Sequence, residues 1–148
     1  MNACDAKLGG GGNVRSDRYE KNPQFLLTCP SKKTDIFINL SQDDTRGQFD
    51  EETGKEKKLA AIAIYLYANK GRPVRPGKQG KCVKYSAYQR VSDITVNWKL
   101  PRYATRKNPN QLMSWTVVIS SWEENPQTNF LLKLFSDKDV TLEALPPV

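Results

Sequence analysis

Three cysteines are the strongest nucleophiles in this sequence, and no histidine is present to activate them. A cysteine or serine nucleophile needs a neighbouring base, usually an imidazole, to be effective at neutral pH. Cys–His and Ser–His pairs are therefore impossible within the chain, and so are histidine-dependent metal sites. Carboxylate catalysis stays formally open, but no apolar surroundings can be identified for any Asp or Glu. The sequence predicts a chain without catalytic residues.

The cysteines, Cys4, Cys29 and Cys82, are odd in number and lack the C-x-x-C spacing. This pattern favours reduced thiols in the cytosol over a disulfide framework or a zinc site. The longest apolar run, Leu59–Ala68, is far shorter than the roughly 20 residues that cross a bilayer. No apolar stretch near the start resembles a secretory signal. We expect a soluble, cytoplasmic protein.

The elements that must position any functional side chain are short apolar segments separated by turn-rich ones. Residues 1–18 are glycine-rich and are expected to form a linker or N-terminal arm, whereas 19–148 should form one domain. The spacing predicts an all-β fold, an eight-stranded antiparallel β-sandwich. The expected strands are Gln24–Thr28, Asp35–Leu40, Ile62–Tyr67, Cys82–Arg90, Val91–Trp98, Ser114–Ser120, Asn129–Phe135 and Val140–Leu145.

The segment Leu59–Tyr67 also fits the apolar stripe of a helix. Its β-branched and aromatic residues favour a buried strand. Trp98 and Trp115 lie on alternating apolar faces and are expected in the core. Trp122, at a strand end, fits either a rim position or an exposed interfacial anchor.

The net charge of +7 and a pI near 9.4 suggest that the protein binds a partner with an acidic surface. The alternative is that the charge only keeps the protein soluble. Successive loops of an antiparallel sandwich alternate between its two ends. One end would then contain ten basic residues and no acidic one. This end is a candidate surface for anionic lipid headgroups or for an acidic face of a neighbouring domain. The alternative is that these bases lie on solvated loops that bind no partner. These bases are Lys32, Lys33, Lys70, Arg72, Arg75, Lys78, Lys81, Arg102, Arg106 and Lys107.

The other end would be acidic. Calcium needs several carboxylate oxygens that converge from more than one loop. Asp43, Asp44, Asp50 and Glu51 are therefore candidate calcium ligands, although interleaved lysines compete with a cation. Nucleic acid is disfavoured as a partner, because the basic loops contain only Tyr103 as an interleaved aromatic residue.

Four motifs resemble one family. Gly11-Gly12-Asn13 and then Asn22-Pro23-Gln24-Phe25 resemble the junction in calpains where the C2-like domain, or domain III, begins. Asn129–Ser136 resembles the penultimate strand of that domain. Ile36–Asp43 and Ala61–Tyr65 resemble two strands between them, in the same order.

The resemblance implies a C2-like sandwich from a calpain-related protein, normally a cytosolic, calcium-regulated cysteine protease. The catalytic Cys, His and Asn of the family lie in a domain that this chain does not contain. The acidic loop of conventional calpains is replaced here by the basic Cys29–Thr34, which points to an atypical member. We therefore expect a regulatory domain that positions a protease core, or that contacts a partner protein or an anionic membrane. The alternative is a free-standing C2-like module that binds anionic phospholipid.

Overall fold

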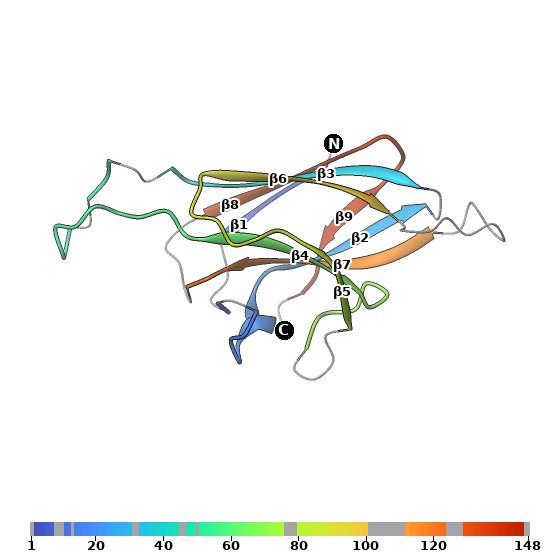
Figure 1. Ribbon diagram of the computed structural model, residues 1–148, viewed down its shortest axis with the longest axis horizontal. Coiled ribbons are helices and arrows are strands. Elements are labelled where there is room, and N and C mark those ends of the chain that lie inside the picture. The colour runs from blue at the N-terminus through green and yellow to red at the C-terminus, as the bar shows by residue number, and fades with distance from the viewer. Residues whose placement is uncertain are drawn as a thin grey trace.

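The chain folds as two antiparallel β-sheets packed face to face (Figure 1). The computed structural model describes residues 11–12, 14–30, 33–44, 47–49, 51–75, 80–100, 112–123 and 129–146, and the backbone of 2–7. These residues form nine strands and one 3-10 helix, so the all-β antiparallel sandwich is confirmed. The elements are β1 (Asn2–Lys7), η1 (Tyr19–Lys21), β2 (Gln24–Pro30), β3 (Thr34–Gln42), β4 (Ile62–Ala68), β5 (Lys81–Tyr85), β6 (Asp93–Leu100), β7 (Leu112–Ser121), β8 (Asn129–Ser136) and β9 (Thr141–Ala144).

The four-stranded sheet has the order β1-β8-β3-β6, and the five-stranded sheet has the order β5-β4-β7-β2-β9. All eight expected strands occur, but the one expected over Cys82–Arg90 already ends at Tyr85. Strand β1 was missed, because residues 2–7 lie in the segment expected to be a linker or arm. Its residues carry no apolar alternation, and it exists through antiparallel pairing with β8, from Asn2 opposite Leu134 to Lys7 opposite Asn129.

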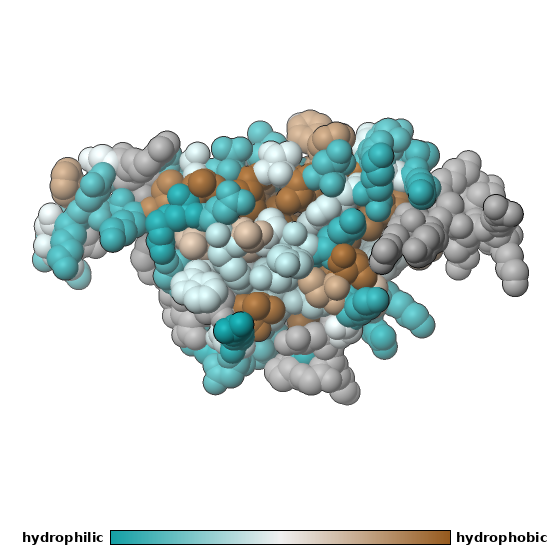
Figure 2. Space-filling model, in the orientation of Figure 1, coloured by the Kyte–Doolittle hydropathy of each residue, from teal (hydrophilic) through white to brown (hydrophobic). Residues whose placement is uncertain are grey.

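The core lies between the sheets and is built from the inward residues of each strand. Ile36, Ile38 and Leu40 of β3 alternate with exposed or half-buried residues, as a strand with one solvated face requires. Trp98 and Trp115 are buried in this core, as expected, and Trp122 is 51% exposed. In Figure 2, apolar side chains are visible between the two layers, flanked by hydrophilic ones.

Strand β4 is buried on both faces, which explains its unbroken apolar sequence. Ile62, Ile64 and Leu66 join the central core, whereas Tyr65 and Tyr67 join a second cluster on the outer face of the five-stranded sheet. The strand interpretation of this segment is confirmed, and the helical alternative is wrong.

The second cluster is covered by the segment that precedes β2. We call residues 11–12 and 14–22, which include η1, the N-terminal cover; Figure 1 shows this blue segment against the five-stranded sheet. The Tyr67 hydroxyl donates a hydrogen bond to the Tyr19 hydroxyl at 2.9 Å. Asn22 Nδ2 donates to the carbonyl oxygens of Gly12 at 2.8 Å and Tyr19 at 3.0 Å. Burial raises the pKa of Tyr67 to about 12.

The outer face of the four-stranded sheet has no comparable cover among the described residues. Phe37 and Phe135 lie opposite each other on β3 and β8 and are 43% and 46% exposed. Across the described part of the chain, no helix combines the length and apolar character needed to span a membrane.

Candidate functional site: a basic hollow beside the β4–β5 connection

The chain reverses sharply after β4 through the turn Asn69-Lys70-Gly71-Arg72. The Arg72 amide donates to the Asn69 carbonyl oxygen at 3.3 Å, and both central residues have positive φ, 61° and 75°. Two positive φ values are the signature of a type I′ turn, which favours glycine at its second central position. The reversal sends residues 69–75, which we call the return loop, back over the outer face of the five-stranded sheet.

Buried polar side chains fix the return loop to the sheet. Asn69 Nδ2 donates to the Arg72 carbonyl oxygen at 2.6 Å, and the Thr116 hydroxyl donates to Asn69 Oδ1 at 2.5 Å. Farther along, Gln24 Nε2 donates to the Val74 carbonyl oxygen at 3.0 Å and its Oε1 accepts from the Val74 amide at 2.6 Å. These hydrogen bonds satisfy the backbone groups of Arg72 and Val74 and hold the return loop against the outer face of the sheet.

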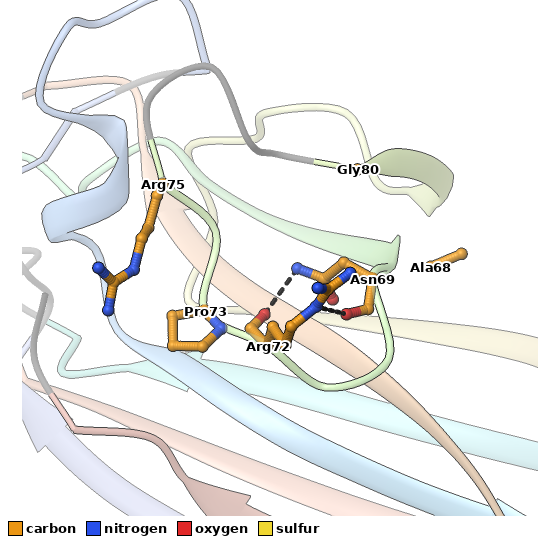
Figure 3. Close-up of a pocket in the computed structure, with 6 residues that line it drawn as sticks. All are labelled: Ala68, Asn69, Arg72, Pro73, Arg75 and Gly80. Carbon is orange, nitrogen blue, oxygen red and sulfur yellow. Dashed lines mark hydrogen bonds between the residues drawn. The ribbon is translucent and has the colours of Figure 1, made fainter.

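A hollow of about 640 Å³ lies between the return loop and the start of β5 (Figure 3). Among the described residues, its lining is polar and basic: Ala68, Asn69, Arg72, Pro73, Arg75 and Gly80. Arg72 Nε donates to the Asn69 carbonyl oxygen at 3.1 Å, which anchors this side chain beside the turn. Figure 3 shows that the Arg75 side chain points away from Arg72, towards the side where η1 lies. The two guanidinium groups therefore occupy different parts of the rim.

Within the described residues, no carboxylate pairs with either arginine; the described ion pairs are Arg90–Glu123, Lys99–Asp35 and Lys138–Asp137. A guanidinium group stays charged at all physiological pH values and carries several donors in a fixed plane. The described lining residues include neither a carboxylate nor a thiol. Their arrangement can bind an anionic group.

The family model for calpain large subunit, domain III matches residues 4–135. The chain belongs to this family. The search of curated proteins found no match. Domain III is a non-catalytic part of calpains, so this chain by itself is not catalytic. The match begins within β1, which agrees with the inclusion of that strand in the four-stranded sheet.

In this calpain domain III, the structure describes five of the ten bases that were predicted to gather at one end, so that gathering stays a prediction. Lys33, Lys70 and Lys81 are exposed next to strand ends, at Thr34, Ala68 and the first position of β5. Arg72 and Arg75 are instead carried back over the sheet by the return loop, a reversal that the alternating-ends argument did not include. The other five bases lie outside the described residues: Lys32, Lys78, Arg102, Arg106 and Lys107.

The candidate calcium ligands are only partly described. Asp43 follows β3, where its carboxylate accepts a hydrogen bond from Asn129 Nδ2 at 3.1 Å. Glu51 is exposed on an arm in which Phe49 pairs with Glu56, and Asp50 lies outside the described residues. Among the residues that the structure describes, no three His, Cys, Asp or Glu side chains gather as metal ligands would. Calcium binding by Asp43, Asp44, Asp50 and Glu51 stays a prediction.

The sequence reasoning missed the residues that shape the hollow, above all Asn69, Gln24 and Gly80. The letters Asn-Lys-Gly after an apolar strand are a turn signal that could have located the reversal. Nothing in the sequence indicates that Gln24 binds a residue fifty positions away. Cys29 is a buried free thiol and Cys82 an exposed one. Partial desolvation raises the pKa of the Cys82 thiol above its ordinary value.

Proposed function

We propose that this domain is a non-catalytic regulatory module that docks on an acidic surface of a neighbouring protease core or of a partner protein. The observation that carries the proposal is the rim of the basic hollow, where Arg72 and Arg75 have no carboxylate partner among the described residues. Two charged groups on an anchored loop are already positioned for a partner, so less conformational entropy is lost on binding.

Membership of the calpain domain III family supports a protease core as the first partner to test. The experiment titrates this chain into the protease core encoded by the same gene and follows heat release at low and high salt. We expect binding that weakens with salt and that falls about tenfold in the Arg72→Ala/Arg75→Ala variant, because electrostatic docking is screened. A gene without a protease core, or binding insensitive to both changes, would contradict the proposal.

A free-standing module for anionic phospholipid is the competing function. Sedimentation with phosphatidylserine vesicles, with phosphatidylcholine vesicles as the control, separates the two. The docking proposal predicts little sedimentation at physiological salt and no dependence on Arg72 or Arg75. Retention on phosphatidylserine that the arginine variant abolishes would favour the lipid module instead. Repeating the assay with calcium, while following the amide shifts of Asp43, Asp44, Asp50 and Glu51, tests the predicted cation site.

A further inference from the structure

We propose that the acidic partner of the basic hollow is an extended peptide segment that adds to the five-stranded sheet as a strand beside β5. One carboxylate of the segment binds at the hollow, and one apolar side chain packs on Tyr85. This inference rests on the proposed docking function and names the form of the docked element.

Strand β5 is an edge strand: it pairs with β4 on one side and with no described strand on the other. The backbone N–H and C=O groups of such an edge are a ready template for an incoming extended segment. Of its five residues, Lys81, Cys82 and Tyr85 are exposed. Among the described residues, no strand pairs with the outer side of β5, so its backbone groups on that side have no strand partner there.

Charge selects the kind of peptide. Gly80, the residue immediately before β5, lines the same hollow as Arg72 and Arg75. The strand itself contains Lys81 and Lys84 and no acidic residue. A basic edge repels a second basic strand and attracts an acidic one, so the charge pattern is complementary to a peptide with carboxylates.

Tyr85 supplies the apolar contact at the other end of the strand. Its side chain is 66% exposed, although its ring is stacked on Tyr65 with centroids 5.7 Å apart and planes at 13°. The Tyr65 ring also packs against the Tyr88 ring, with centroids 5.9 Å apart, and the Tyr88 ring packs against the Trp122 ring, with centroids 5.4 Å apart. The exposed ring therefore rests on a packed aromatic row, and a rigid aromatic surface loses little entropy when it is covered.

The separation of the two contacts sets the spacing in the peptide. Lys81 and Tyr85 are the first and last residues of β5, and their separation is somewhat less than the roughly 13 Å of a regular strand, because the pairing with β4 shifts register between Leu66 and Tyr67. The bound segment should carry a carboxylate and a large apolar side chain about three to four residues apart.

The test uses fluorescence anisotropy with a labelled synthetic peptide of alternating glutamate and valine, with one phenylalanine, and a counterpart in which lysine replaces glutamate. We expect the acidic peptide to bind and the lysine peptide to fail. Arg72→Ala/Arg75→Ala and Tyr85→Ser should each weaken binding about tenfold, as contacts at the centre of an interface do. Lys99→Ala, an exposed charge on β6 of the other sheet, is the matched control and should change the Kd by less than about twofold.

Two further measurements test strand addition itself. A peptide N-methylated on alternate amides loses the donors that face β5 and should not bind, whereas methylation of the other amides should be tolerated. Bound peptide should also slow alkylation of Cys82, measured by mass spectrometry, with the buried Cys29 as an internal reference. Equal binding of both methylated peptides, or an equal loss in Lys99→Ala, would overturn the inference. Salt-sensitive binding of the protease core would survive that outcome, so the proposed function can stand while this inference fails.

Discussion

The two outer faces of the sandwich differ in what covers them. The five-stranded sheet carries the N-terminal cover and the return loop, with Tyr19, Asn22 and Gln24 buried beneath or within them. The four-stranded sheet exposes Phe37 and Phe135 and, among the described residues, carries no such layer. The covered face uses buried polar side chains to hold irregular backbone, because an irregular segment lacks the ladder hydrogen bonds of a sheet.

The difference explains where the basic hollow lies. A loop that simply connected β4 to β5 would extend beyond the end of the sandwich, and its arginines would be mobile in solvent. The bonds from Asn69 and Gln24 hold it against the sheet, so the rim has a defined shape. Substitutions on the covered face should therefore affect both stability and the site, whereas matched substitutions on the bare face should cost less stability and leave the site unchanged.

The largest expected effect follows from removal of Tyr19. Tyr19 belongs to the cover, and its fully buried side chain packs against Tyr65 and Tyr67 of β4. We expect Tyr19→Ala to lower the free energy of unfolding by about 3–5 kcal/mol, as other buried aromatic truncations do. Phe37→Ala on the bare face should cost about 1 kcal/mol or less. Urea denaturation followed by tryptophan fluorescence measures both, and equal costs would remove the distinction between the faces.

Gln24→Ala tests the attachment of the return loop. The change removes both hydrogen bonds from the Gln24 side chain to Val74 and leaves the buried amide and carbonyl groups of Val74 without these partners. The expected cost is about 2–3 kcal/mol, together with faster amide hydrogen exchange at Val74. Asn39→Ala, which removes exposed hydrogen bonds on β3, is the counterpart on the bare face and should cost about 0.5 kcal/mol. Unchanged exchange at Val74 would contradict the role of Gln24.

Gly71→Ala tests the turn that begins the return loop. Gly71 has φ of 75°, and a Cβ there would lie 2.3 Å from Leu26 Cδ1. Gly54 has a similar φ of 68° with nothing within 4 Å, so Gly54→Ala is a control for backbone strain alone. We expect Gly54→Ala to lower the free energy of unfolding by about 1 kcal/mol and Gly71→Ala to lower it by about 1 kcal/mol more, measured by thermal unfolding. Equal costs would mean that Leu26 moves aside without loss.

The smallest effect at neutral pH is expected for Tyr67→Phe, which tests a pH dependence of the covered face. The pKa of Tyr67 is raised by burial to about 12, from an ordinary value near 10, so the folded state holds a proton that the unfolded state releases first. The contribution of the Tyr67 proton to the free energy of unfolding should be fully present below about pH 10 and should be lost as the pH rises from about 10 to about 12. Tyr67→Phe should lose about 1 kcal/mol at neutral pH and show a shallower alkaline decline, measured by urea midpoints across that range. A decline as steep as in the parent would assign the effect to Tyr19 or Tyr65, whose pKa values are raised in the same direction.

Strands with a clear alternation were predictable because their periodicity is local. Ile36, Ile38 and Leu40 specify an inward face in the sequence alone, and the structure places all three in the core. Lys33 and Lys81 lie next to strand ends, and their membership of one basic end stays a prediction. The position of Arg72 and Arg75 over the sheet could not be predicted, since it depends on hydrogen bonds to Gln24 and Thr116 from other strands.

The sequence by itself determined the absence of histidine chemistry, the all-β class and the family to which the chain belongs, because residue types and short motifs carry that information directly. Tertiary structure alone decided that β1 pairs with β8, that β4 is buried on both faces and that the β4–β5 connection returns across the sheet. Each of these depends on contacts between residues far apart in the chain, and the free energy of such contacts is not encoded in any local pattern. The basic hollow belongs to this second group, because the turn that creates it is local but the bonds that hold it are not.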